Sequence, residues 1–276
     1  MGQLAFNRSA KGGDHAVVIG GSMAGLFASR VLSDYFERVT IVERDQLPEG
    51  PEFRYGVPQS RHAHALLKRG LEVMEELFPG LEAELATEGA VPLDGADVLS
   101  LTVAGWSNRF QGLPLLAMSR ELIEWAVRQR TLRLPQVSVL ERREATGLAP
   151  SADASRVTGV LLREKGTKVM TSLEADLVVD ASGRGSKAPE WLEGLGYPQP
   201  KEVVINSHLG YASRYYKIHP IPEADWKALQ ITSKPPSMTR AGFILPIEGK
   251  RWLVTLAGYC DYPPNDEAGF LEFARS

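Results

Sequence analysis

Six consecutive residues near the N-terminus and one acid further on have the types and spacing of a dinucleotide site: Gly20, Gly21, Ser22, Met23, Ala24, Gly25 and Glu43. Glycine adopts the backbone angles of a sharp turn, and without a side chain it lets a helix lie close to a strand. The bare N–H groups at the start of a helix attract a pyrophosphate. Glu43 follows Gly20 by 23 residues, where a carboxylate accepts hydrogen bonds from a ribose diol and disfavours a 2′-phosphate. These residues therefore predict a dinucleotide other than NADP.

The elements that must position these residues are a strand, a helix and a second strand. The apolar run Ala16–Ile19 predicts the first strand, Leu26–Phe36 the helix, and Arg38–Val42 the second strand, which ends at Glu43. This order is the layout of a dinucleotide-binding βαβ unit. The fingerprint departs from G-x-G-x-x-G because Ser22 stands at the middle glycine, and its small hydroxyl can donate to a phosphate. A glycine-rich turn in an ordinary α/β protein is the alternative explanation.

The composition excludes several classes of function. The chain has 276 residues, 43% hydrophobic and 24% charged, and its formal net charge of −3 gives no electrostatic reason to expect nucleic acid. The single cysteine, Cys260, excludes an intramolecular disulfide and a cysteine-based zinc site, and we expect it in the core. Residues 1–13 carry no apolar run of a signal peptide, and no segment predicts a transmembrane helix. We therefore expect a cytoplasmic location.

The chain predicts two domains. Residues 1–198 form an α/β domain with a Rossmann-like mixed or parallel sheet, in which Asp176–Asp180 returns as a buried strand after a β-meander insertion at about 157–173. The long stretch 44–61 is rich in proline and glycine and predicts a loop of functional importance. Residues 199–276 change to an alternating, aromatic pattern that predicts an antiparallel sheet in a second, α+β domain.

Three further motifs follow the fingerprint: Gly-Val-Pro-Gln-Ser-Arg-His-Ala-His at 56–64, Ser119-Arg120 at a helix start, and Asp-Leu-Val-Val-Asp-Ala-Ser-Gly-Arg-Gly-Ser at 176–186. In this order they resemble the FAD-dependent, single-component aromatic-hydroxylase (group A) class of monooxygenases. The chain is most similar to the bacterial epoxidase-like branch that acts on polyketide polyenes. The resemblance covers nearly the whole chain, and residues 1–198 and 199–276 then correspond to the FAD-binding domain and the substrate domain.

The resemblance implies the chemistry of a flavoprotein oxidoreductase. NAD(P)H reduces the flavin, the reduced flavin forms a C4a-(hydro)peroxide with O₂, and one oxygen atom enters a small apolar substrate by hydroxylation or epoxidation. No side chain is assigned as catalytic, no metal is expected, and the oligomeric state stays open. The implied contacts are the pyrophosphate at residues 20–25, the adenosine ribose at Glu43, the adenine at Arg44, the flavin side at Arg61, the phosphate or ribityl region at Arg120, and a second dinucleotide motif at Asp180 and Gly183.

One departure limits this resemblance. The class uses a third FAD segment, a Gly-Asp motif after the substrate-domain strands, and no match to it stands before Ser276. We therefore expect a chain that is incomplete at its C-terminal end. A flavin-dependent halogenase, a prenyl-chain reductase and a truncated non-catalytic dinucleotide-binding module remain alternatives, as does an NAD-dependent dehydrogenase. The Trp-x-Trp-x-Ile-Pro motif of halogenases is absent from the sequence.

Several of these residues have structural explanations beside the functional ones. Arg61 fits a surface charge, Arg120 an exposed first-turn residue and Asp180 a strand-end carboxylate. His62 and His64 at spacing i, i+2 do not face one another on a helix, which favours capping or packing over a metal pair. On a strand, the side chains of Tyr211 and Tyr215 share a face opposite to Tyr216, where they either line an apolar substrate cavity or fill the sheet packing.

Overall fold

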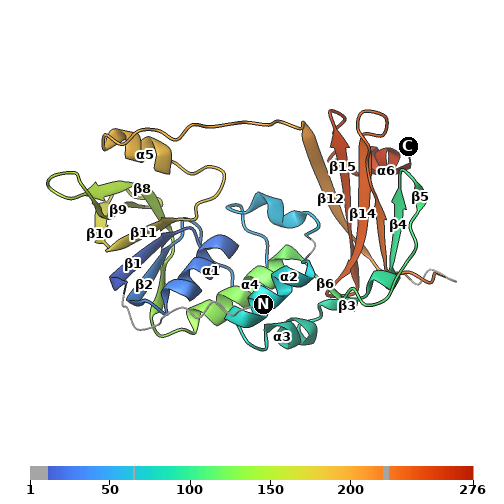
Figure 1. Ribbon diagram of the computed structural model, residues 1–276, viewed down its shortest axis with the longest axis horizontal. Helices are drawn as coiled ribbons and strands as arrows, with labels where there is room; N and C mark the ends of the chain where they lie inside the picture. The colour runs from blue at the N-terminus through green and yellow to red at the C-terminus, as the bar shows by residue number, and fades with distance from the viewer. Residues whose placement is uncertain (1–11, 65, 220–223, 276) are drawn as a thin grey trace. The chain divides into compact units, whose positions relative to one another are not determined.

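The computed structural model describes residues 12–64, 66–219 and 224–275, and the contacts within it divide the chain into two units (Figure 1). Unit 1 comprises Met1–Gly50, Arg54–Val57 and Val127–Glu202, and unit 2 comprises Pro51–Phe53, Pro58–Ala126 and Val203–Ser276. One division falls between Glu202 and Val203, and the domain boundary at 198/199 stays a prediction from the sequence. Another division places residues 58–126 in unit 2, and it depends on long-range strand pairing that a local pattern does not reveal.

Unit 1 is built on a parallel sheet with the strand order β11-β1-β2-β7 (Figure 1). Its central strand β1 has the fully buried residues Ala16, Val17 and Val18, because an apolar run suits a strand covered on both faces. The class is therefore α/β, as predicted. The bounds are β1 Gly13–Ile19, α1 Met23–Leu32, β2 Phe36–Val42, β7 Val137–Leu140 and β11 Leu177–Asp180.

A three-stranded antiparallel meander packs against this sheet, with the strand order β10-β9-β8. Its bounds are β8 Arg143–Pro150, β9 Val157–Glu164 and β10 Met170–Glu174, so the meander begins before the predicted insertion at 157–173. The two sheets share one apolar core of Val17, Ile19, Val42, Val160, Leu162 and Ala175. Two helices complete the unit, the C-terminal part of α4 (Arg120–Leu132) and α5 (Ala188–Gly194).

Unit 2 contains a six-stranded sheet with the order β12-β15-β14-β13-β4-β5, antiparallel except between β13 and β4 (Figure 1). One face packs on α6 (Glu267–Arg275) through Phe270 and Phe273. The strands are β4 Val98–Thr102, β5 Gly105–Trp106, β12 Leu209–Lys217, β13 Ala228–Ile231, β14 Arg240–Ile247 and β15 Arg251–Tyr259, and a separate pair joins β3 Val91–Leu93 to β6 Leu115–Ala117. The other helices are η1 Pro58–Arg61, α2 Lys68–Leu77, α3 Leu81–Thr87 and η2 Gly95–Asp97.

Three features differ from expectation. The alternating pattern of 199–276 predicts a strand that includes residues 203–208, but these residues are not in a strand. The side chains of Val203, Val204 and Ile205 are 80–90% exposed, because no neighbouring strand pairs with them among the described residues. The proline content of 219–240 predicts a loop, but this stretch contains strand β13, since the prolines lie outside Ala228–Ile231. Cys260 is exposed and has a positive φ of 58°, so its assignment to the core was wrong.

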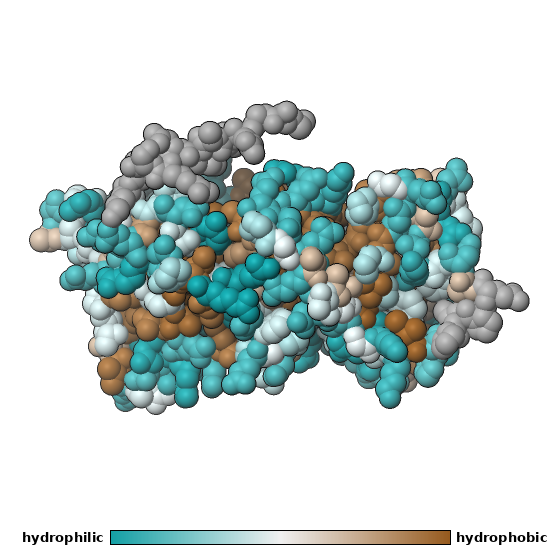
Figure 2. All heavy atoms as spheres, turned by 90° about the horizontal axis from the view of Figure 1, so that it is seen from below, coloured by the Kyte–Doolittle hydropathy of each residue, from teal (hydrophilic) through white to brown (hydrophobic). Residues whose placement is uncertain are grey.

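Figure 2 shows apolar side chains gathered in several patches between polar ones. In unit 1, Val31, Leu140 and Leu177 are each between 37% and 41% exposed. Among the described residues no helix combines the length and the hydropathy that crossing a membrane requires. The predictions about a signal peptide rest mainly on residues 1–11, which lie outside the described residues.

Candidate dinucleotide-binding site

The two glycine-rich turns of unit 1 meet at one edge of the parallel sheet. Strands β1 and β11 pair in register, so that Ile19 lies opposite Asp180. The next residue, Ala181, donates its N–H to the carbonyl of Ile19 at 2.8 Å. The carboxyl ends of neighbouring parallel strands are the usual place for ligands in such folds. The structure therefore brings together two predicted motifs that are far apart in the sequence.

The first turn has no room for side chains at Gly20 and Gly25. Gly20 has φ +103°, and a Cβ there would lie 2.5 Å from the carbonyl oxygen of Ala181. A Cβ on Gly25 would lie 1.8 Å from the carbonyl oxygen of Gly20. Helix α1 then begins with Ser22 as N-cap, without a side-chain capping bond and without an acid in its first turn. A tight turn leading to a positive helix end without an acid fits a pyrophosphate.

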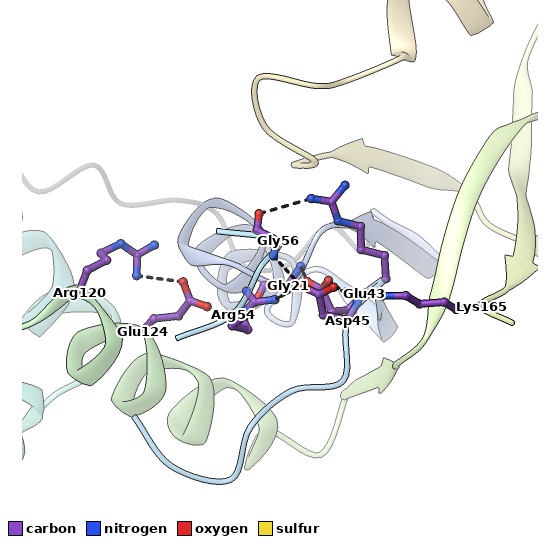
Figure 3. A network of polar contacts seen from close by, with 9 residues as sticks. Gly21, Glu43, Asp45, Arg54, Gly56, Arg120, Glu124 and Lys165 are labelled. Carbon is purple, nitrogen blue, oxygen red and sulfur yellow. Dashed lines mark hydrogen bonds and ion pairs between the residues drawn. The ribbon is translucent and has the colours of Figure 1, made fainter. Parts of the chain in front are cut away.

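Glu43 is fixed beside this turn. It is only 5% exposed, at the end of β2. Its Oε2 accepts the N–H of Gly21 at 2.8 Å, and its Oε1 accepts the N–H of Asp45 at 2.9 Å. Figure 3 shows Glu43 next to Gly21. The predicted ribose acceptor and the predicted phosphate turn are therefore in direct contact.

Arg54 is the central residue that sequence reasoning missed. Its side chain is 5% exposed, and its Nη1 lies 3.1 Å from Oε2 of Glu43 and 3.8 Å from Oδ2 of Asp45. Its Nη2 donates to the carbonyl of Gly21 at 3.1 Å (Figure 3). The length of the predicted loop indicated a function, but a lone arginine within it carried no periodic signal.

A hydrogen bond between Asp45 and Gly56 joins the two ends of the loop from Arg44 to Val57. Oδ2 of Asp45 accepts the N–H of Gly56 at 2.9 Å, and a Cβ on Gly56 would lie 2.3 Å from that oxygen. Arg44 is exposed, and its Nη2 lies 3.5 Å from the carbonyl of Gly56. Further along, Arg128 of α4 is 3% exposed, and its Nη2 donates to the carbonyl of Pro48 at 2.6 Å.

The second glycine turn is organised by Asp180. Its Oδ1 accepts the N–H of Ser182 at 2.9 Å, and its Oδ2 accepts the hydroxyl of Ser186. Burial raises the pKa of Asp180, but these hydrogen bonds outweigh burial, so its pKa lies below the ordinary value. Gly183 has φ +86° and open space at its missing Cβ, and Arg184 is exposed.

The two other predicted cofactor residues, Arg61 and Arg120, belong to unit 2. Arg61 is exposed, and its guanidinium lies 3.7 Å from the ring centroid of Phe53, a cation–π contact. Arg120 is the first residue of α4, and it is 8% exposed rather than surface-exposed. Its Nη1 lies 2.9 Å from Oε2 of Glu124. The contacts of these two arginines with Phe53 and Glu124 lie within unit 2.

The face of β12 opposite α6 carries a small, partly buried polar cluster in unit 2. His62 Nδ1 lies 2.9 Å from the Ser213 hydroxyl, which lies 2.6 Å from the Thr255 hydroxyl. Burial, together with the nearby His64, lowers the pKa of His62. Tyr215 shares this face, and burial and Glu121 raise its pKa to about 12. Among the described residues no three His, Cys, Asp or Glu side chains converge as metal ligands.

The FAD binding domain family matches residues 15–252. Protein Rv3254 of Mycobacterium tuberculosis is 38% identical over 261 residues, covering 91% of this chain and 54% of that protein. The chain therefore spans about half the length of this curated relative.

Solved structures of similar fold are flavoproteins. PqsL of Pseudomonas aeruginosa, described as a probable FAD-dependent monooxygenase, aligns with a TM-score of 0.66 at 15% identity, covering 90% of this chain and 61% of PqsL. The flavin-dependent brominase Bmp2 aligns with a TM-score of 0.60 at 14% identity, covering 90% of this chain and 56% of Bmp2. The flavin-dependent halogenase CmlS aligns with a TM-score of 0.60 at 23% identity, covering 89% of this chain and 41% of CmlS. At these identities the likeness concerns the fold.

Proposed function

Because this chain belongs to the FAD binding domain family, we propose that it supplies the nucleotide-holding part of an FAD-dependent monooxygenase. The observation that carries the proposal is the buried contact of Glu43 with Gly21, at the point where two glycine turns meet. A pyrophosphate and a ribose lie next to one another in FAD; Glu43 offers a partner for the ribose, and the helix start that follows the Gly21 turn offers one for the pyrophosphate.

We assign each part of the site one task. Gly20 and Gly21 shape the first turn, with their own N–H groups donating to Val42 and Glu43, and the positive N-terminal end of α1 binds the pyrophosphate. Glu43 accepts the ribose hydroxyls, and Arg44 lies on the exposed side, toward the adenine. Asp180 holds the second turn, in which Gly183 leaves the backbone open to the cofactor. Arg61 and Arg120 of unit 2 stay proposed contacts to the flavin side and the phosphate or ribityl region.

The reaction that we propose uses NAD(P)H and O₂, and inserts one oxygen atom into a small apolar substrate by hydroxylation or epoxidation. When bound, FAD supplies the electron transfer and the oxygen chemistry. The half-exposed Tyr211 and Tyr215 on one face of β12 support an apolar surface for the substrate in unit 2. The epoxidase-like branch and the cytoplasmic location remain predictions from the sequence.

A flavin-dependent halogenase is the second candidate. The fold likeness to Bmp2 and CmlS favours it, whereas the absence of the Trp-x-Trp-x-Ile-Pro motif disfavours it. A prenyl-chain reductase would form its product without added oxygen. Labelled O₂ and halide dependence therefore separate the three chemistries in the full-length protein.

The first experiment is a visible absorption spectrum of the purified chain before and after FAD is added and free FAD removed. We expect retained flavin bands, which Glu43→Ala weakens. Full-length protein is then supplied with NAD(P)H and ¹⁸O₂. Flavin-loaded protein that oxidises NAD(P)H but never inserts oxygen into any apolar substrate would contradict the monooxygenase proposal.

A further inference from the structure

We propose that Arg54 is a positioning residue: it holds Glu43 in the orientation that receives a ribose hydroxyl, and it fastens the 44–57 loop to the phosphate turn. This inference rests on the proposed function in one respect, that Glu43 takes the ribose. Arg54 itself acts on the nucleotide through Glu43.

The guanidinium of Arg54 contacts both the phosphate turn at Gly21 and the ribose acceptor Glu43. Arg54 donates to the carbonyl of Gly21, while the N–H of Gly21 donates to Glu43. Arg54 also lies 3.1 Å from the same Oε2 of Glu43, which closes a ring of three residues. The planar fork of arginine presents several N–H groups at fixed angles, whereas lysine is a point charge. This ring therefore specifies the orientation of Glu43 as well as its charge.

The charges explain why an arginine is required in this loop. The Glu43, Asp45 and Arg54 side chains are 6%, 14% and 5% exposed. Two carboxylates so close together are unfavourable without a buried cation, and Arg54 lies within 4 Å of both. Lys165 also reaches Asp45, at 3.6 Å, but its side chain is 60% exposed. Arg54 is therefore the buried compensating charge for both acids.

The hydrogen bonds leave one oxygen of Glu43 available. A carboxylate has about four acceptor sites. Within the part of the chain that the structure describes, Oε2 faces Gly21 and Arg54, whereas Oε1 receives only Asp45. By occupying Oε2, Arg54 directs Oε1 toward a ribose hydroxyl. Ribose recognition should therefore depend on Arg54 although Arg54 does not touch the sugar.

Arg128 provides a matched control. It is an equally buried arginine that contacts the same loop, 3% exposed, and it donates to the carbonyls of Pro48 and Gly50. These contacts fix the far part of the loop. Arg128→Lys thus tests loop anchoring, whereas Arg54→Lys tests loop anchoring together with the orientation of Glu43.

The test measures ribose recognition by calorimetry with ADP and 2′,3′-dideoxy-ADP. In the wild-type chain we expect ADP to bind about tenfold or more tightly than 2′,3′-dideoxy-ADP. Only ADP has ribose hydroxyls to donate to Glu43, and a hydrogen bond to a charged acceptor contributes about 1.5–3 kcal/mol. Arg54→Lys and Glu43→Gln should reduce this ratio toward one, and the double variant should reduce it no further. Arg128→Lys should keep the wild-type ratio even if its melting temperature falls.

A ligand-free measurement covers the case of weak nucleotide binding. Hydrogen exchange of the free chain should become faster at residues 20–25 in Arg54→Lys than in Arg128→Lys, with exchange in β8 and β9 unchanged. An unchanged ADP ratio in Arg54→Lys, or equal exchange in the two variants, overturns the proposal. If the wild type binds neither ADP nor FAD, the proposed function fails, and the exchange comparison still decides the role of Arg54.

Discussion

Gly25 illustrates how a missing side chain shapes the site. A helical glycine is ordinarily less stable than alanine by about 1 kcal/mol. Here a Cβ would lie 1.8 Å from the carbonyl oxygen of Gly20, and backbone cannot give way as a flexible side chain can. The requirement for glycine therefore comes from packing at the turn.

We expect Gly25→Ala to destabilise the chain by about 1–3 kcal/mol and to weaken FAD binding, because the turn must open to accept the methyl group. A Cβ on Gly194, at the end of α5, would meet no atom within 4 Å, so Gly194→Ala is the control. Urea unfolding and flavin binding measure both variants. Equal stability of the two would show that the turn does not need glycine at position 25.

His15 predicts a pH dependence of stability. It is 5% exposed, with Nδ1 2.6 Å from the carbonyl of Glu174 and Nε2 2.8 Å from the hydroxyl of Thr40. Burial, together with Arg38, lowers its pKa below 6.5. The unfolded state then binds the proton first as the pH falls. The stabilisation is complete above pH 6.5 and is lost as the pH falls toward the lower pKa of the folded state.

We therefore expect the free energy of unfolding to fall between pH 7.5 and 5.5, by at most about 1.4 kcal/mol per pH unit for one group. His62 in unit 2 has a lowered pKa too and adds to the slope. His15→Gln should make the slope shallower by the His15 share, and His62→Gln by its own. An identical slope in wild type and His15→Gln would assign the effect elsewhere.

At the scale of elements, the pairing of β1 with β11 assembles the site. Residues Ile19 and Asp180 end these strands side by side, so each turn is braced by the other. Asp180 holds the second turn through Ser182 and Ser186. The turn after β11 is thus part of the support for the turn after β1.

Asp180→Ala removes both hydrogen bonds and should weaken FAD binding by about 1–3 kcal/mol while the parallel sheet persists. Flavin binding measures the first effect and far-UV circular dichroism the second. Asp153→Ala is a comparison at an exposed carboxylate, also hydrogen-bonded, in the turn between β8 and β9. We expect it to bind flavin like the wild type. Equal binding by the two variants would contradict the bracing role.

The sequence predicted the elements whose patterns are local. Periodicity and glycine spacing identified β1, α1, β2 and β11, because apolar runs and sharp turns restrict residue type. The prediction that β11 is buried was wrong: it lies at the edge of the sheet, and Leu177 is 38% exposed. It did not predict the parallel pairing of β13 with β4, because the local pattern of a strand does not specify its pairing partner. Arg54 was missed for a similar reason: its role depends on Glu43, which lies on another element, and not on its neighbours.

At the scale of the whole molecule, cofactor binding should stabilise the units unequally. The residues described for the dinucleotide turns all lie in unit 1. A ligand that binds only the folded state adds about 2.7 kcal/mol at a hundredfold excess over Kd. FAD should therefore raise the midpoint temperature of the unfolding transition of unit 1, with hydrogen exchange used to assign each transition to its unit. A shift confined to unit 2 would place the binding site there.

The pairing of β1 with β11 also affects the folding rate. The pairing joins residues far apart in the sequence, such as Ala16 and Leu177, and the neighbouring hydrogen bond from the N–H of His15 to Asp176 spans 161 positions. Pairing over such a separation costs loop-closure entropy before it gains contact energy, and chains rich in such pairings fold slowly. The edge strand β11 can therefore pair with β1 only late in folding. If FAD contacts both turns as proposed, it stabilises only the state in which β11 is already paired with β1, and it should slow unfolding more than it speeds folding.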